Sequence, residues 1–209
     1  MPIPHGARYL CARPWSGSAR RPLMPPPAHP ALARRIAALL TRQVHDKDND
    51  EVRAVVSLQA RDACEYCLQP TNPPFNVDHI IPPGLWADYV AGRLGGVPYR
   101  PGRHGPDHID NYAWACPHCN NKKDEEVAHW VTTGPIRLFD PRHDHWPEHF
   151  VFMDGSRHPI IAGASPEGRA TELALDMNAG GHRGLLRTRH VAIVERSYPP
   201  RWARRAYGV

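Results

Sequence analysis

The sequence has no hydrophobic run that approaches the roughly 20 apolar residues of a membrane-spanning helix. Its first 15 residues contain no continuous apolar segment, which a secretory signal peptide requires. No segment repeats at a period typical of solenoids or propellers. We therefore expect a cytoplasmic protein without a membrane partner, in a compartment where disulfides are uncommon.

Long regular elements are also scarce, because 24 of the 209 residues are proline and most of these lie outside the periodic stretches. This argues against a long helical bundle, whereas a hydrophobic content of 41% still favours a folded protein. Apolar residues at helical spacing predict helices at 29–43, 51–63, 120–131 and 165–178, the last with Ser165 as its start signal.

Short strands are predicted at 75–81 and 112–115. The segment between them, 82–110, has 11 Gly or Pro among its 29 residues and is predicted to be a long loop. Loops of this length are uncommon in compact domains unless they are functional or disordered.

Negative charge is scarce toward both ends of the chain. Residues 1–63 carry a net charge of +5 and residues 136–209 carry +3, whereas residues 64–135 carry −3. An acidic centre between basic flanks fits a metal-containing site held between surfaces that bind phosphate. The alternative, from charge alone, is a solvated arginine-rich surface.

Cysteine is rare, but four of the 5 cysteines form two C-x-x-C pairs. The pairs are Cys64/Cys67 and Cys116/Cys119, with 48 residues between them, and the fifth, Cys11, is predicted to have no role. Two such pairs in a cytosolic chain fit a tetrahedral structural zinc site. Two disulfides or a redox dithiol are the alternatives, although a redox dithiol needs only one pair.

Asp78 and His79 are adjacent in the expected strand between the two cysteine pairs. Asn111 precedes the second expected strand, and Asn120 follows the second cysteine pair directly. This arrangement resembles the HNH endonuclease family, the ββα-metal nucleases, over roughly residues 60–130. The matching positions are Cys64-Glu-Tyr-Cys67, Asp78-His79, Asp110-Asn111, Cys116-Pro-His-Cys119, Asn120 and Lys123.

Two downstream segments extend the resemblance. LFDPRHDHWPEHF and GRATELALDMN are similar to the C-terminal extension of a bacterial HNH subfamily, which is typically written with LFNPR, W-x-x-HF and GRAT. We expect this extension to pack over the nuclease core.

The resemblance implies an α+β fold with a ββα-metal (HNH or His-Me finger) core, stapled by the four-cysteine zinc site and flanked by helices. The expected organisation is a disordered Pro- and Arg-rich segment at 1–28, a helical segment at 29–62, the nuclease core at 63–133 and the extension at 134–209.

The resemblance also implies a metal-dependent endonuclease that hydrolyses DNA phosphodiester bonds, by nicking or by double-strand cleavage, without an organic cofactor. His79 is the candidate general base, because a histidine side chain ordinarily titrates near neutral pH. Asn111 is expected to orient that base by holding the loop backbone. Lys122 and Lys123 are expected to contact phosphate from the start of a helix.

Asp78 and Asn120 are the candidate ligands of one catalytic divalent ion. Carboxylate and amide oxygens suit hard cations, so Mg²⁺ or Mn²⁺ is expected. Adjacent residues of a strand normally point to opposite faces. Asp78 and His79 can therefore serve one site only where the strand is irregular or where the phosphate straddles its edge.

Other histidines offer minor alternatives. His104 and His108 in the long loop could approach the phosphate, and His143, His145 and His149 could form a second metal site. Two functions without catalysis also stay open: a zinc-stabilised nucleic-acid-binding module, and a zinc domain for protein contacts. The sequence names no DNA target, and it leaves the oligomeric state open.

Overall fold

The computed structural model describes residues 34, 37–39, 41–42, 45–61, 63–69, 75–101, 103–132, 134–153 and 160–178. The elements in chain order are α2 (Asp50–Gln59), β1 (Asn76–His79), η1 (Pro83–Leu85), α3 (Trp86–Val90), η2 (Ile109–Asn111), β2 (Tyr112–Ala115), α4 (Pro117–Lys123), β3 (Ala128–Val131), β4 (Gly134–Arg137), α5 (Trp146–His149), β5 (Phe150–Met153), β6 (Ile160–Gly163) and α6 (Pro166–Ala174). Its strands form separate antiparallel pairs, β1–β2, β3–β4 and β5–β6. The expected α+β class is confirmed.

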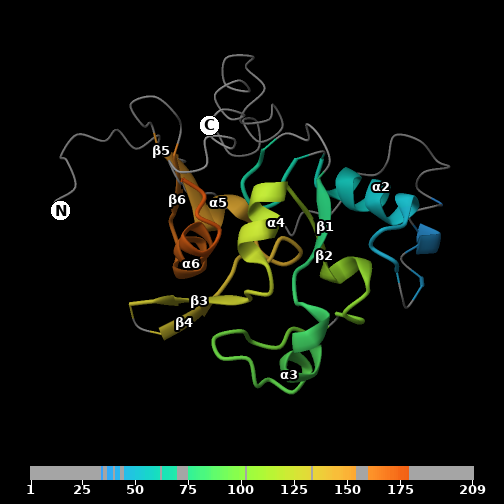
Figure 1. Cartoon of the computed structure of the whole chain (residues 1–209), viewed down its shortest axis with the longest axis horizontal. Helices are drawn as coiled ribbons and strands as arrows, with labels where there is room; N and C mark the ends of the chain where they lie inside the picture. The colour runs from blue at the N-terminus through green and yellow to red at the C-terminus, as the bar shows by residue number, and fades with distance from the viewer. Residues whose placement is uncertain are drawn as a thin grey trace, which may run out of the picture.

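The β1–β2 pair lies between two helices. Asp78 of β1 is opposite Ala113 of β2, and His79 is opposite Tyr112. Helices α2 and α4 both contact the pair and flank it on opposite sides (Figure 1). A two-stranded ribbon is at best marginally stable alone, so this pair depends on the helices that cover it.

Helix α2 shows how the sequence positions one of these helices. The side chain of Asn49 caps its start by accepting hydrogen bonds from the backbone N–H groups of Glu51 and Val52. Val52, Val55 and Val56 are buried on one face, as their helical spacing predicted. The helix joins the core that also contains the β1–β2 pair.

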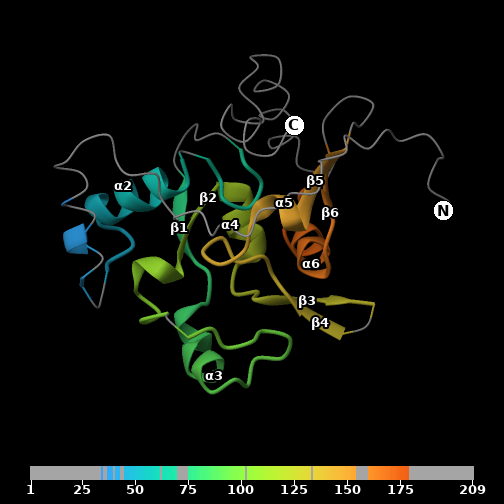
Figure 2. The ribbon, with the colours of Figure 1, turned by 180° about the vertical axis from the view of Figure 1, so that it is seen from behind.

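Helix α6 connects the remaining two strand pairs. It contacts both β3–β4 and β5–β6 and lies between them (Figure 2). Its predicted start is confirmed, because the Ser165 hydroxyl accepts a hydrogen bond from the Gly168 backbone N–H at 3.0 Å. A Cβ on Gly168 would lie 1.8 Å from the backbone oxygen of His149, so this contact between α6 and α5 requires glycine.

One hydrophobic core joins the cysteine-rich segment to the C-terminal extension. Val56 and Val77 share it with Phe150 and Leu175 of the extension. The Trp146 indole Nε1 donates a hydrogen bond to the backbone oxygen of Tyr66 at 2.9 Å. The described part of the extension therefore packs directly on the segment that carries the cysteines.

Two predicted elements differ from those observed. The expected helix at 120–131 is wrong: α4 spans Pro117–Lys123, and the residues after it form β3. Cys116 caps the start of α4 and Pro117 occupies its first turn, whereas Asp124, with φ of 45°, ends it. The loop at 82–110 also contains η1 and α3.

Several expectations concern residues outside the described part of the chain. These are the disordered segment at 1–28, most of the helix at 29–43, Cys11 and the last part of the extension, beyond residue 178. Among the helices that are described, none is long and apolar enough to cross a membrane.

Candidate metal centre and candidate active site

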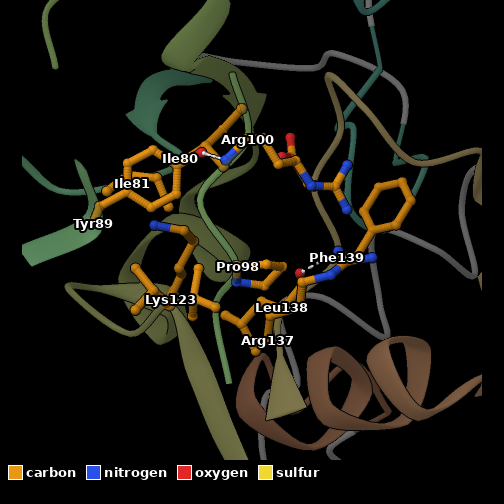
Figure 3. Close-up of a pocket in the computed structure, with 12 residues that line it drawn as sticks. Ile80, Ile81, Tyr89, Pro98, Arg100, Lys123, Arg137, Leu138 and Phe139 are labelled. Carbon is orange, nitrogen blue, oxygen red and sulfur yellow. Dashed lines mark hydrogen bonds between the residues drawn. The ribbon is translucent and has the colours of Figure 1, made fainter. Parts of the chain in front are cut away.

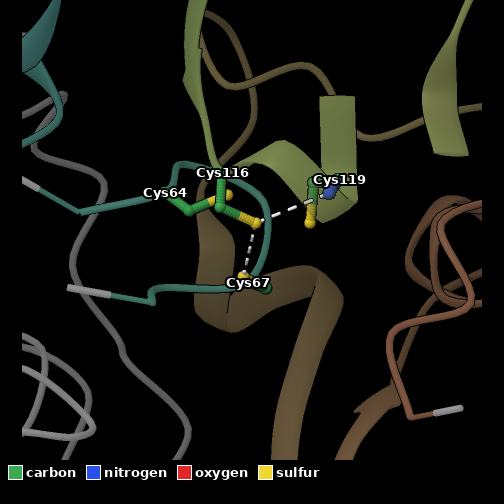
Figure 4. A group of neighbouring side chains, drawn as sticks. All are labelled: Cys64, Cys67, Cys116 and Cys119. Atoms are coloured by element: carbon green, nitrogen blue, oxygen red, sulfur yellow. Dashed lines mark hydrogen bonds between the residues drawn. The ribbon is translucent and has the colours of Figure 1, made fainter. Parts of the chain in front are cut away.

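Four cysteines converge in the core. Cys64, Cys67, Cys116 and Cys119 are all buried, and their sulfur atoms lie within 4.8 Å of one another (Figure 4). No disulfide links them, and the Sγ atoms of Cys67 and Cys116 are 3.8 Å apart. Tetrahedral zinc with Zn–S bonds of about 2.3 Å places sulfurs about 3.8 Å apart. The cluster can therefore hold a structural metal ion such as zinc.

Local backbone geometry forms both cysteine pairs. Cys116 is the N-cap of α4, and its sulfur accepts a hydrogen bond from the Cys119 backbone N–H at 3.4 Å. At the first pair, the chain forms a tight turn in which the Leu68 N–H donates to the Cys64 carbonyl at 2.8 Å. Leu68 adopts the left-handed backbone conformation, with φ of 58°. Each pair thus presents its two sulfurs to one point.

Glu65 attaches the first cysteine pair to its surroundings. Its backbone N–H donates to the Trp114 carbonyl at 2.9 Å, and its Oε2 accepts from the Trp114 N–H at 2.8 Å. Arg142 of the extension forms a bidentate ion pair with the same carboxylate. The first pair is therefore held by both β2 and the extension.

An open pocket of about 330 Å³ runs along β1. It brings together three of the predicted site residues, Asp78, His79 and Asn120. All four residues of β1 line it, and β1 pairs only with β2 among the described strands, so the pocket lies at the outer edge of this strand. A ligand at that edge would meet side chains from both faces of the strand, which is one of the two conditions under which Asp78 and His79 can serve one site. The remaining lining residues are Lys47, Asp48, Arg53, Asn76 and Val77.

Asp78 has two donors on its carboxylate. The Tyr66 hydroxyl donates to Oδ2 at 3.0 Å, and the Lys123 ammonium lies 3.3 Å from the same oxygen. Burial raises the pKa of the Asp78 carboxyl, although Lys123 and Tyr66 oppose that shift. Burial and the neighbouring carboxylate also raise the pKa of Tyr66, so its hydroxyl stays a donor.

Lys123 is not placed for the phosphate contact expected of it. Lys123 is 1% exposed, donates to the His79 carbonyl at 2.7 Å, and lines a separate small cavity with Ile81 and Tyr89 (Figure 3). It turns inward because the buried Asp78 requires a positive partner. Lys122 is partly exposed and pairs with Asp176 at 3.2 Å, so its phosphate contact stays a prediction.

His79 is held by a residue that the sequence analysis did not identify. Its Nε2 lies 2.9 Å from Asp107 Oδ1, and its ring packs edge-on against Tyr112. An Nε2–H that donates to Asp107 leaves the electron pair on Nδ1. Among the described residues, Nδ1 has no hydrogen-bond partner.

Asn111 is fully buried and binds the backbone of the long loop. Its Nδ2 donates to the carbonyls of Ile81 and Pro106 at 2.7 and 2.8 Å, and its Oδ1 accepts from the Ile81 N–H at 2.9 Å. The Ile81 contacts fix the chain two residues after His79. This geometry is the one its expected positioning role requires.

Arg103 links Asn111 to the extension. Its Nη1 donates to Asn111 Oδ1 at 2.9 Å, and its Nη2 forms an ion pair with Asp140. The Arg103 side chain is 1% exposed, so removal of its carboxylate partner would leave a buried charge. Asp140 belongs to the LFDPR segment, which therefore braces the loop that carries Asn111.

Asp140 makes stability pH-dependent. Burial by itself raises the pKa of Asp140. Hydrogen bonds and charge from His143 and Arg103 outweigh burial, so the pKa of Asp140 lies well below its ordinary value. A lowered folded-state pKa contributes stability above the unfolded-state value near 3.9, and this contribution is lost as the pH falls toward the folded-state value.

We therefore expect Asp140→Asn to cost about 3 kcal/mol at pH 7 and progressively less below about pH 4. Urea unfolding at several pH values would measure this difference. Asp88→Asn is the control, because Asp88 is half exposed and pairs only with Arg93 on the surface. An equal loss in both variants, or a loss independent of pH, would contradict the assignment.

The remaining histidines separate into two groups. His143 contacts Asp140, His145 lies beside Glu148, and the His149 ring bonds the Ser165 hydroxyl, so these three do not form one metal site. His104 and His108 do not line the pocket along β1, and lie instead against Asp110.

Sequence reasoning missed Lys47, Arg53, Asp107, Arg103 and Asp140. Lys47 lies in a polar break, and Arg53 lies on the half-buried side of α2, where it donates to the Phe75 carbonyl at 2.7 Å. For Asp107 the signal was its position between two histidines in the segment 103–110, RHGPDHID. That position did not indicate which histidine Asp107 would contact.

No family model matches the chain, and no curated protein or solved structure was found to be similar to it. The resemblance to HNH endonucleases therefore stays a prediction that depends on the residues themselves.

Proposed function

We propose that this protein is a divalent-metal-dependent endonuclease with a ββα-metal core formed by β1, β2 and α4. The observation that carries the proposal is the pocket along β1, where Asp78 and His79 meet Asn120 of α4. A carboxylate, an imidazole and an amide in one open pocket are the groups that metal-assisted phosphodiester hydrolysis uses.

His79 acts as the general base in this proposal. Asp107 holds its Nε2, which leaves Nδ1 to take a proton from the attacking water. The Lys123 ammonium holds the backbone at the His79 carbonyl, and Asn111 holds it two residues later, at Ile81. The imidazole is thus positioned before the substrate arrives.

The donor set of Asp78 and Asn120 fits Mg²⁺ or Mn²⁺. Both supply hard oxygen ligands, and Mg²⁺ is commonly held by one or two protein groups, with waters and phosphate oxygens completing the shell. When bound, the ion supplies Lewis-acid stabilisation of the phosphate and of the leaving oxygen. Tyr66 keeps the Asp78 carboxylate oriented by donating to Oδ2.

DNA is the proposed partner, and Lys47 and Arg53 are the proposed phosphate contacts. Both line the pocket, and Lys47 is exposed enough to reach a bound strand. They take the role that the buried Lys123 was expected to fill. Zinc is the proposed ion of the four-cysteine cluster, where it fixes the start of α4 and hence Asn120.

Metal-dependent cleavage of supercoiled plasmid tests the function. We expect nicked or linear product with Mg²⁺ or Mn²⁺ and none with EDTA. Asn120→Ala should raise the metal concentration for half-maximal rate by at least roughly 10–100-fold, whereas Asn120→Asp, which keeps an oxygen ligand, should not. Asn121→Ala is the matched control, because its exposed side chain does not line the pocket. Absence of product from folded, zinc-loaded protein on several DNA and RNA substrates would reject the nuclease.

A non-catalytic nucleic-acid-binding module is the second candidate. The Lys123–Asp78 ion pair favours it, because an ammonium already neutralises the proposed metal ligand. Such a module would bind DNA with salt-dependent affinity but would not cleave it with any divalent ion. A domain for protein contacts alone would show no salt-dependent DNA binding.

A further inference from the structure

Three potential metal ligands converge in the loop before η2, outside the pocket along β1. His104 Nδ1 lies 2.6 Å from Asp110 Oδ2, and His108 Nδ1 lies 2.8 Å from Asp110 Oδ1. The three ligand atoms lie within 4.8 Å of one another. The His104 side chain is 67% exposed, so an ion can reach the group from solvent.

Two contacts of His108 Nδ1 in this cluster are incompatible with one another. The Asp110 backbone N–H donates to His108 Nδ1 at 3.3 Å, so this nitrogen must present an electron pair. The same nitrogen faces Asp110 Oδ1, which is buried and has no hydrogen-bond partner among the described residues. One imidazole nitrogen cannot accept from the N–H and donate to the carboxylate at once. A buried oxygen left without a partner requires an explanation.

His45 is excluded as a further ligand. Its ring packs edge-on against His108 at 4.8 Å between centroids. Its Nε2 bonds the Leu39 carbonyl at 2.6 Å, and its Nδ1 accepts from the Ile109 N–H at 3.2 Å. Both nitrogens are therefore occupied, and His45 serves to fix the ring of His108.

We propose that His104, His108 and Asp110 form a second metal site, for a divalent transition ion such as Zn²⁺. Two imidazoles and a carboxylate suit zinc and its neighbours, and three protein ligands leave one position for water. Ligand atoms on tetrahedral zinc are about 3.3 Å apart, so the two His–Asp contacts must open by about half an ångström. The exposed His104 can move by that amount.

The three ligands of the site lie in the same loop as Asp107 and next to Asn111, the two proposed positioning residues. Asp107, which holds His79, lies between His104 and His108, and Asn111 follows Asp110 directly. An ion bound by residues 104, 108 and 110 would fix this loop. The metal site itself does not depend on the nuclease assignment, because it follows from the geometry of the cluster alone.

Titration of zinc-loaded protein with Co²⁺ tests the proposal. Cobalt at the four-cysteine site shows intense thiolate charge-transfer absorption, whereas cobalt bound by nitrogen and oxygen shows only weak visible bands. For protein that holds one zinc per chain, with Mg²⁺ in excess to occupy the proposed Asp78–Asn120 site, we expect one added equivalent with the weak bands alone. His104→Ala and Asp110→Asn should each weaken this binding by roughly tenfold or more. His145→Ala is the control for surface histidines, because it lies outside the cluster.

Each outcome decides the proposal. Loss of the added equivalent in His104→Ala, with retention in His145→Ala and unchanged circular dichroism, would support it. No added equivalent in wild type, or equal binding by wild type and His104→Ala, would overturn it. Asp110→Asn then shows whether the carboxylate takes part. Plasmid cleavage is not used as a readout, so failure of the proposed nuclease would not affect the result.

Discussion

Cys116→Ser is expected to abolish stable folding of the described core. In the proposed site, the four sulfurs share one zinc ion and lie at the centre of a core that contains both β2 and the extension. Structural zinc binds zinc-finger peptides with apparent free energies of about 10–16 kcal/mol, whereas whole domains are stable by only about 5–15 kcal/mol. Loss of the ion therefore removes as much free energy as the fold has available.

The same reasoning predicts sensitivity to chelators and to acid. Burial raises the pKa of the Cys64 thiol, so without metal this thiol keeps its proton at neutral pH. Binding of the ion must release this proton, and the affinity for the ion falls as the pH falls. A strong chelator should unfold the protein faster at pH 6 than at pH 8.

Thermal unfolding and zinc content measure this prediction together. Wild type should contain one tightly bound zinc per chain, and Cys116→Ser should lose both the zinc and the cooperative transition. Cys11→Ser controls for loss of a thiol as such, because Cys11 lies outside the four-cysteine cluster. A cooperative transition in Cys116→Ser at the wild-type temperature would mean that the cluster is not a structural zinc site.

The cysteine cluster could be predicted from the sequence because the geometry of each cysteine pair depends on residues that are close together in the chain. A C-x-x-C spacing determines the geometry of each pair, and only the meeting of the two pairs had to be inferred. The two strands and the capped start of α6 were likewise predictable, since β-branched runs, prolines and Ser165 act within a few residues. These parts of the fold follow from short-range physical chemistry.

The surroundings of the site could not be predicted, because they depend on contacts between distant segments. Lys123 turns toward Asp78, which lies 45 residues earlier, and Arg103 pairs with Asp140 across 37 residues. An exposed and a buried lysine look the same in sequence. The end of α4 at Asp124 was missed because Val127, Trp130 and Val131 continue the helical spacing, although Trp130 and Val131 belong to the β3–β4 strand pair.

His79→Ala is expected to reduce cleavage by roughly 10²–10⁴-fold while DNA binding is retained. Among the described residues that line the pocket, His79 is the imidazole, and Asp107 holds it with Nδ1 as the acceptor. Truncation removes the base but leaves Asp78, Asn120 and the basic side chains in place. The loss should therefore fall on the cleavage rate rather than on affinity.

Single-turnover cleavage and fluorescence anisotropy with the same DNA separate these two effects. Added imidazole should partly restore cleavage by His79→Ala, because it can fill the vacated space and accept the proton. A purely structural role would give no such rescue. His129→Ala is the control, since His129 pairs with Glu126 away from the pocket. Full activity in His79→Ala would mean that another group acts as the base. An equal loss of cleavage and of DNA binding would mean that His79 only maintains the fold of the DNA-binding surface.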